Sequence, residues 1–301
     1  METQFEIIAR GLQFPEGPVC LGDGSFLVCE MAIGYLTRVL ANGALRRLAH
    51  LGGSPNGAAI GPDGAAYVCN SGGYNFDPVP HGLRPAAPPH EYSGGRIERV
   101  DIATGAFSVL YTHSDKGPLK GPNDIVFDRS GGLWFTDTGR MRERDADLGG
   151  VYYARTDGSL CRESAFGLIL PNGVGLSPDQ TKLYVSETLT ARLWEYTVSG
   201  PGEIVPGSGR CLYGAGGFQF FDSLAVEAGG VICVATLLNG GITMISPDGE
   251  QVEHLPLPDA QTTNICFGGA GRRRAFVTLS EHGFLIAMDW PGAGLALNFS
   301  A

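Results

Sequence analysis

The chain has 301 residues, of which 43% are hydrophobic and 17% charged, a composition typical of folded globular proteins rather than disordered ones. Its formal net charge is −10 and its longest basic run is Arg272–Arg274, so we expect no nucleic acid and no anionic membrane surface among its partners. No apolar stretch reaches the roughly 18 residues that a membrane-spanning helix needs.

The first fifty residues predict short strands joined by tight turns. After the apolar segment FEIIARGL, candidate strands rich in Val, Leu, Phe and Tyr cover residues 17–21, 25–30, 35–40 and 44–50. GDG and ANGA turns separate them, and Gly, at 46 of 301 residues, has about twice its usual share. Apolar spacing of the helical kind is rare along the chain, so we expect almost no helix.

The same unit then recurs six times. Each copy has an acidic or amide residue, a short apolar run, a Gly-rich turn and a second apolar run. The leading residues of the copies are Glu16, Asn56, Asn123, Asn172, Asp222 and Asn264. Four of the five spacings between them are 40 to 50 residues, the length of a four-stranded propeller blade. The sequence predicts an all-β fold: a six-bladed β-propeller formed by residues 1–301 as one domain, in which FEIIARGL supplies the outer strand of the last blade.

Two insertions interrupt the repeat. The longer one, 71–94, holds five prolines and little alternation, and we interpret it as a long loop. The shorter one covers residues 138–149. If the first strand of each blade is innermost, the antiparallel second strand returns to the mouth where the first begins. Both insertions follow a second strand, so we expect them to lie over that mouth.

The six leading residues are expected to meet at the same mouth, because each begins an innermost strand. The last residues of the second strands would form a wider circle there: Glu30, Asn70, Asp137, Glu187, Thr236 and Thr278. Taken singly, Asn and Asp before Gly are also common turn residues. Taken together, the leads offer carboxylate and amide oxygens without His or Cys, which suits a hard cation such as Ca²⁺, Mg²⁺ or Mn²⁺. Facing carboxylates would need such a cation, or a proton, between them. The sequence therefore predicts a central metal-binding channel.

The cysteines and histidines point to no second metal site. Seven cysteines are an odd number without a C-x-x-C pair, so we expect free thiols in a reducing compartment. The N-terminal METQFEIIAR shows no secretory signal, which adds to the expectation of a cytoplasmic protein. The histidines lack metal-binding spacing, but His81 and His90 lie in the longer insertion, from which they are placed to reach a bound substrate.

Four segments, in this order, carry a resemblance to a known family: PEGPV at 15–19, GPNDIVFDRSGGLWFTD at 121–137, PNGVGLSPDQTKLYVSET at 171–188, and the aspartate of FDSLAVEAGGVICVAT at 221–236. Over essentially its whole length the chain resembles the gluconolactonase, regucalcin and senescence-marker-protein family of six-bladed propellers. The resemblance implies one divalent ion (Ca²⁺, Zn²⁺, Mn²⁺ or Fe²⁺) held by Glu16, Asn172 and Asp222. It also implies that Asn123 touches the metal or the substrate.

The activity that this resemblance implies is the hydrolysis of sugar lactones or related cyclic esters, with a small-molecule lactone as the partner. A metal held by protein oxygens polarises the lactone carbonyl, and we expect Asp222 to be the general base for the attacking water. Family members often carry Arg two residues before the Asn of the ND motif. This chain has Gly121 there, beside Lys120, which we expect to contact substrate. Phe220 and Phe221 make the rim more apolar, which favours a less hydroxylated lactone.

Two other interpretations remain open at this point. One is another enzyme on the same scaffold, such as a phosphotriesterase-like hydrolase or a cyclase of strictosidine-synthase-like architecture, since fold alone does not fix function. The other is a non-catalytic propeller that binds calcium or a small ligand. A closed ring of blades needs no partner subunit, so we expect a monomer.

Overall fold

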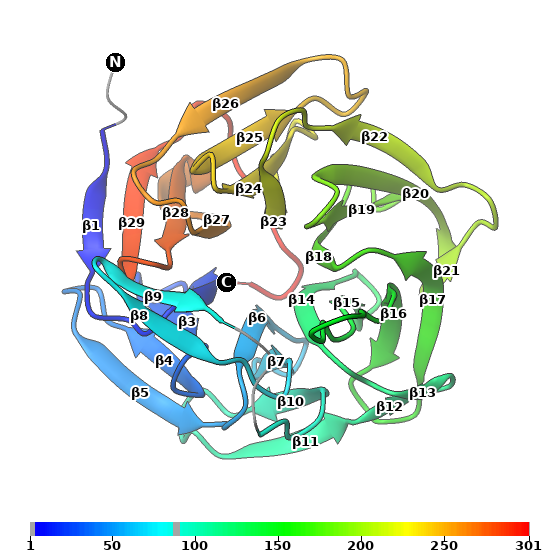
Figure 1. The fold of residues 1–301 in the computed structure, drawn as a ribbon, viewed down its shortest axis with the longest axis horizontal. Helices are drawn as coiled ribbons and strands as arrows, with labels where there is room; N and C mark the ends of the chain where they lie inside the picture. The colour runs from blue at the N-terminus through cyan, green and yellow to red at the C-terminus, as the bar shows by residue number, and fades with distance from the viewer. Residues whose placement is uncertain (1–3, 87–90, 301) are drawn as a thin grey trace.

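The computed structural model describes residues 4–86 and 91–300 and forms a ring of six antiparallel sheets around a central channel (Figure 1). Apart from one 3₁₀ turn, η1 (Ala270–Arg272), the regular elements of these residues are strands. The six innermost strands contact one another in a closed cycle. The predicted six-bladed β-propeller is confirmed.

The first three blades run from the innermost strand outwards. Blade 1 contains β2 (Pro15–Cys20), β3 (Phe26–Glu30), β4 (Tyr35–Val39) and β5 (Leu45–His50). Blade 2 contains β6 (Pro55–Ile60), β7 (Ala66–Asn70), β10 (Arg96–Val100) and β11 (Phe107–Tyr111). Blade 3 contains β14 (Pro122–Phe127), β15 (Gly132–Asp137), β16 (Gly149–Arg155) and β17 (Cys161–Leu168).

The other three blades follow the same order. Blade 4 contains β18 (Pro171–Leu176), β19 (Lys182–Glu187) and β20 (Arg192–Gly200), with β21 (Glu203–Ile204) and β22 (Arg210–Gly214) both pairing with β20. Blade 5 contains β23 (Phe220–Val226), β24 (Ile232–Leu237), β25 (Gly241–Ile245) and β26 (Val252–Pro256). Blade 6 contains β27 (Thr262–Gly268), β28 (Arg274–Leu279), β29 (Phe284–Asp289) and β1 (Glu6–Ala9). Two small hairpins, β8 (Phe76–Val79) with β9 (Gly82–Pro85) and β12 (His113–Ser114) with β13 (Gly117–Pro118), lie outside the blades.

The N-terminal strand closes the ring. β1 pairs antiparallel with β29, with Glu6 opposite Ala287, so the last blade takes its outer strand from the start of the chain. This pairing covers the edge that β29 would otherwise expose. The prediction for FEIIARGL is confirmed.

The core lies between neighbouring blades. Inner strands are buried on both faces, as in β14, while outer strands such as β20 alternate between buried and exposed positions. Aromatic side chains join adjacent blades: the Tyr67 and Phe127 rings meet edge-on with centroids 5.1 Å apart. Phe26 and Phe276 join blades 1 and 6 at 4.5 Å. All seven cysteines are free thiols, as expected.

One end of the channel is covered by the C-terminal segment, which runs to the centre of the ring (Figure 1). The amide of Leu295 donates to the carbonyl of Val226 at 2.9 Å, and the Asn298 side chain donates to the carbonyl of Phe127 at 2.8 Å. Both acceptors end innermost strands, whereas the leading residues begin them. The segment therefore covers the end opposite the leads, above a mostly apolar cavity of about 110 Å³.

The two insertions lie at the other end. Part of 71–94 forms a hairpin, β8 (Phe76–Val79) and β9 (Gly82–Pro85), where the sequence predicted an irregular loop. Contacts with blade 6, which local sequence cannot reveal, hold it: the Leu83 amide donates to the carbonyl of Glu281 at 3.2 Å. The shorter insertion is also a hairpin, in which the amide of Asp147 donates to the carbonyl of Arg140 at 2.9 Å.

Candidate functional site

Every innermost strand has an irregular register at or beside its leading residue. The shifts lie between Glu16 and Val19, Pro55 and Ala58, Pro122 and Ile125, Pro171 and Val174, Phe221 and Leu224, and Thr262 and Asn264. A β-bulge adds a residue, bends the strand and changes the direction of the side chains beside it. All six leading residues are buried. The repeat seen in the sequence is thus also a repeated irregularity of the backbone at one end of the channel.

Glycine after the leading residue allows neighbouring inner strands to approach closely. Gly17 has φ of 53°, and a Cβ added there would lie 2.3 Å from the carbonyl oxygen of Asn56 in the next blade. At Gly173, which follows Asn172, a Cβ would lie 2.6 Å from the amide nitrogen of Leu224. A side chain at either position would collide with the backbone of the neighbouring inner strand.

Three buried carboxyl groups carry charges that oppose one another. Burial raises the pKa of Glu16 to about 8, and the negative charge of Asp124 adds to this shift. Burial, and then the charge of Glu16, raises the pKa of Asp222 well above its ordinary range. Burial raises the pKa of Asp124 to about 7. A bound cation would remove this electrostatic cost, as would protonation.

Asp124 is a member of this group that the sequence analysis missed. Its carboxylate accepts hydrogen bonds from the amide of Ile125 at 2.9 Å and from the amide of Val174, in the next blade, at 3.3 Å. The sequence did contain a signal for Asp124, because it is the second residue of the Asn-Asp pair at the start of the inner strand of blade 3. Glycine holds the equivalent position in blades 1, 2 and 4, so an acid there should have stood out.

Amide side chains surround the carboxylates. Asn264 donates its Nδ2 to Oε2 of Glu16 at 3.2 Å. Asn172 accepts at Oδ1 from the hydroxyl of Ser223 at 3.3 Å. Oδ1 of Asn123 and Oδ1 of Asn56 are buried and have no hydrogen-bond partner among the described residues. Buried acceptors without a donor are costly, and a ligand or cation would supply what they lack.

This donor set fits a hard divalent cation. Carboxylate oxygens of Glu16 and Asp222 and amide oxygens of Asn172 and Asn123 are ligands of the kind that Ca²⁺ and Mg²⁺ prefer. Within the described part of the chain, no three His, Cys, Asp or Glu side chains gather as a metal site by themselves. The amide oxygens would therefore be essential members of any metal site here.

Hydroxyl groups from two second strands connect blade 3 to blade 4 and blade 4 to blade 5. Thr136 accepts from the amide of Asp124 at 3.2 Å and donates to the carbonyl of Asn172. In the following blade Ser186 accepts from the amide of Gly173 at 2.7 Å and donates to the carbonyl of Asp222 at 2.5 Å. These two bridges fix the backbone of Asn172 and Asp222.

The wider circle of polar residues has a structural task in four blades. Each of these side chains accepts a hydrogen bond from a backbone amide in the segment that enters the same blade. The pairs are Glu30 with Gln13 at 3.0 Å, Asn70 with Ser54 at 3.1 Å, Asp137 with Lys120 at 2.7 Å, and Glu187 with Ile169 at 2.7 Å. Their oxygens hold the start of the inner strand in place.

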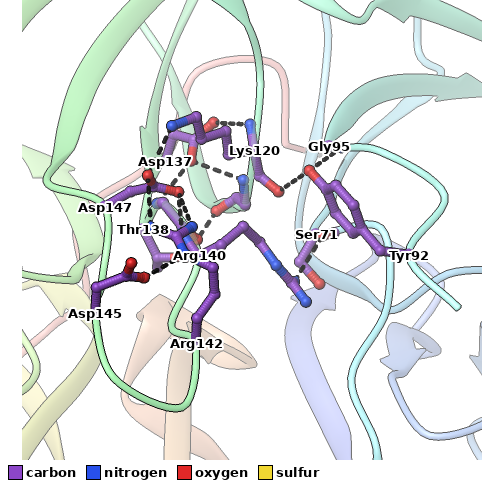
Figure 2. Close-up of polar contacts among 12 residues, drawn as sticks. Ser71, Tyr92, Gly95, Lys120, Asp137, Thr138, Arg140, Arg142, Asp145 and Asp147 are labelled. Atoms are coloured by element: carbon purple, nitrogen blue, oxygen red, sulfur yellow. Dashed lines mark hydrogen bonds and ion pairs between the residues drawn. The ribbon is translucent and has the colours of Figure 1, made fainter. Parts of the chain in front are cut away.

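Two of the other predicted substrate contacts, Lys120 and His81, interact with side chains of the protein itself. The Lys120 ammonium pairs with Asp147 at 2.8 Å, on the shorter insertion (Figure 2). The His81 ring stacks on His282 of blade 6, with centroids 5.4 Å apart. His90 lies outside the described residues.

Tyr74 and Arg140 occupy the mouth, and the sequence analysis missed both. The Tyr74 amide donates to the hydroxyl of Ser54 at 2.9 Å, just before β6, and burial raises the pKa of the Tyr74 phenol while the charge of Arg140 opposes this shift. The Arg140 guanidinium lies over the Tyr74 ring, with Cζ 5.3 Å from the centroid. Neither residue belongs to the repeated unit, so the repeat gave no signal for them.

A closed ring of six blades around a channel lined with carboxylates and amides defines a six-bladed β-propeller with an oxygen-rich site at one mouth. The family profile described as SMP-30/Gluconolactonase/LRE-like region matches residues 14–281, and the chain belongs to this family.

Individual relatives agree with this assignment. The chain is 29% identical to a gluconolactonase of Zymomonas mobilis, over 94% of this chain and 80% of that protein. It is 28% identical to lactonase drp35 of Staphylococcus saprophyticus, over 85% and 74% of the two chains. The fold matches the calcium-binding protein regucalcin of Agrobacterium tumefaciens with a TM-score of 0.79 and 19% identity, covering 100% of this chain and 98% of that one.

Within residues 4–86 and 91–300 no helix combines the length and apolar character required to cross a bilayer.

Proposed function

We propose that the chain is a metal-dependent hydrolase that opens the ring of a lactone, a sugar lactone or a related cyclic ester. The observation that carries this proposal is the group of buried, mutually repelling carboxyl groups beside orphaned amide oxygens, at the channel mouth that the C-terminal segment leaves open. Two relatives named as a gluconolactonase and a lactonase support the reaction class.

Glu16, Asn172 and Asp222 would hold the divalent ion. Such an ion, when bound, polarises the lactone carbonyl and stabilises the oxyanion that forms when water attacks. Asp222 then takes the proton of the attacking water at its carboxylate, and Glu16 mainly balances charge.

Neighbouring groups orient the substrate. Asn123 is buried with an unpaired Oδ1, and its amide binds the metal or the substrate. The β8–β9 hairpin lies at the mouth against blade 6, and the C-terminal segment covers the far end of the channel.

The ion, the partner, the oligomeric state and the cellular compartment complete the proposal. The resident ion is Ca²⁺, Zn²⁺, Mn²⁺ or Fe²⁺, and the regucalcin relative, described as calcium-binding, favours the first. The partner is a small lactone, and the protein is a monomer. The seven free thiols suit a reducing cytoplasm.

The test combines elemental analysis of the purified protein with a proton-release assay on a panel of lactones and organophosphates. We expect about one divalent ion per chain and turnover of lactones, with Glu16→Gln and Asp222→Asn losing ion and turnover together. Ser246→Ala, in a turn on the outside of blade 5, serves as a control. Tight metal uptake without turnover would make the protein a binding propeller, and turnover of organophosphates alone would make it a phosphotriesterase-like hydrolase.

A further inference from the structure

The Arg140 guanidinium lies over the rings of Tyr74 and Tyr92, where the two insertions meet; Figure 2 shows it with Tyr92 and Ser71. Its Cζ lies 4.4 Å from the ring centroid of Tyr92 and 5.3 Å from that of Tyr74. Its Nη1 donates to the carbonyls of Gly73 at 3.0 Å and Ser71 at 3.3 Å. A cation between two aromatic faces is attracted by both and is shielded from water by both.

The surroundings of Arg140 are rigid. Asp147 accepts from the Arg140 backbone amide at 3.2 Å, and it is itself fixed by Lys120 at 2.8 Å and by Arg142 at 3.0 Å. The Tyr92 hydroxyl donates to the carbonyl of Lys120 at 2.7 Å. The guanidinium is consequently positioned before any ligand arrives, which lowers the entropic cost of binding.

Gly121 explains why the shorter insertion can occupy this place. A Cβ at Gly121 would lie 2.6 Å from the carbonyl oxygen of Gly139 and 2.6 Å from Oγ1 of Thr138. Any side chain at position 121 would therefore collide with the start of the hairpin that presents Arg140. Gly121 is therefore needed for the hairpin to lie where it does, and the hairpin in turn places the positive charge of Arg140 at the mouth.

The positive charge of Arg140 has no counterion among the described residues. Asp147 pairs with Lys120 and Arg142, and Asp145 pairs with Arg142. Asp137 is engaged by the amides of Lys120, Gly121 and Gly139. Nε and Nη2 of Arg140 make no hydrogen bond with any described residue, so donors of the guanidinium fork remain available.

The position of Arg140 also relates it to the proposed reaction centre. Arg140 Nη1 donates to the carbonyl of Ser71, which directly follows β7 at the mouth where the leading residues lie, and the guanidinium lies over the Tyr74 ring. A ligand whose reactive carbonyl enters the channel would therefore extend another of its groups towards Arg140.

We propose that Arg140 recognises an oxyanion group on the substrate (a carboxylate, phosphate or sulfonate), so that the preferred substrates are anionic lactones. This inference rests on the proposed function. A planar guanidinium matches an oxyanion through paired, charge-assisted hydrogen bonds. Recognition of hydroxyl groups alone would leave a partly desolvated charge unbalanced.

The kinetic test compares a matched pair, glucono-1,5-lactone and its 6-phosphate, in the metal-loaded protein. For Arg140→Gln we expect the ratio of kcat/KM for the phosphate to that for the neutral lactone to fall ~10- to 100-fold, through KM rather than kcat. Arg140→Lys should recover part of the loss. Arg144→Gln removes the same charge from the exposed tip of the same hairpin, where Arg144 has no hydrogen bond or ion pair among the described residues, and should leave the ratio within about twofold.

A binding test separates this inference from the proposed reaction. 1,5-Anhydroglucitol has no carbonyl to hydrolyse, and calorimetry compares it with its 6-phosphate and its 6-carboxylate. An Arg140-dependent preference for either anion supports the inference even if the wild-type protein opens no lactone, in which case the proposed function fails alone. The two anionic ligands show which oxyanion is preferred. The proposed role of Arg140 would be overturned by either of two results. In one, Arg140→Gln weakens the binding of neutral and anionic ligands equally; in the other, Arg144→Gln weakens anion binding as much as Arg140→Gln does.

Discussion

The hydroxyl of Ser186 donates a 2.5 Å hydrogen bond to the backbone carbonyl of Asp222, across the boundary between blades 4 and 5. The same hydroxyl accepts from the amide of Gly173 at 2.7 Å within its own blade. One side chain therefore sets the distance between the innermost strands that carry Asn172 and Asp222. The separation of these two proposed metal ligands depends on a residue that touches neither the ion nor the substrate.

Replacing this hydroxyl should weaken metal binding. For Ser186→Ala we expect a loss of about 1–3 kcal/mol in stability, because a buried amide and a buried carbonyl lose a partner. We also expect about a tenfold weaker metal affinity, because Asp222 is no longer held. Denaturant unfolding and calorimetric metal titration measure the two effects. Thr243→Val removes a buried hydroxyl that bonds Thr236 and His254, and it should cost stability without changing the affinity. Equal affinity losses in both variants would contradict this role.

Neutral replacements of the channel carboxylates should stabilise the metal-free protein. Both Glu16 and Asp222 have pKa values raised first by burial, so their charged forms are unfavourable in the folded chain. Glu16→Gln and Asp222→Asn keep the shape and remove the charge. At pH 8 with chelator present we expect both variants to melt several degrees above the wild type, while in excess metal ion the order reverses. If the wild type melts at a higher temperature than both variants with chelator present, the carboxylate charges are already compensated in the metal-free protein.

The stability of the metal-free protein should fall as pH rises. The pKa of Glu16 is about 8 in the folded chain against an ordinary value of 4.5, so the folded state holds the proton more tightly than the unfolded state does. The resulting stabilisation is complete below about pH 4.5 and is lost as pH rises towards 8. Asp222 shifts in the same direction.

Metal ions should reverse this trend, because they bind the deprotonated carboxylates and displace protons. We expect the gain in melting temperature on adding the ion to be larger at pH 8 than at pH 5. Calorimetry in buffers of different ionisation enthalpy should detect protons released on ion binding at pH 7, because Glu16 and Asp222 both have raised pKa values in the metal-free protein. A gain that does not change with pH would rule out protonated carboxyl groups in the metal-free site.

The repeat made the fold predictable, and the same repeat limited what could be foreseen of the site. Six copies with a leading Glu, Asn or Asp fixed the blade number and the buried ring, because each copy supplies the same strand start. The sequence analysis did not predict Asp124, because the bulge beside it sets the direction of its side chain and the alternation of residues along the strand does not. Tyr74 and Arg140 lie in insertions, whose positions depend on contacts with distant residues: Glu281 for the longer insertion, and Ser71 and Gly73 for Arg140. Local patterns do not encode such contacts.

The ion pair between Arg84 and Glu281 should govern the opening of the β8–β9 hairpin. Nε of Arg84 lies 2.5 Å from Oε2 of Glu281, whose side chain is only 6% exposed, so breaking the pair leaves a buried carboxylate without its cation. An exposed pair contributes up to about 1 kcal/mol, and we expect Arg84→Ala to raise the open population about two- to fivefold. Limited proteolysis with mass spectrometry should show faster cleavage between residues 74 and 86. Arg99→Ala breaks a pair with Asp63, at a turn away from the mouth, and should leave that cleavage unchanged. Equal acceleration in both variants would mean that loss of overall stability, and not release of the hairpin, exposes the segment.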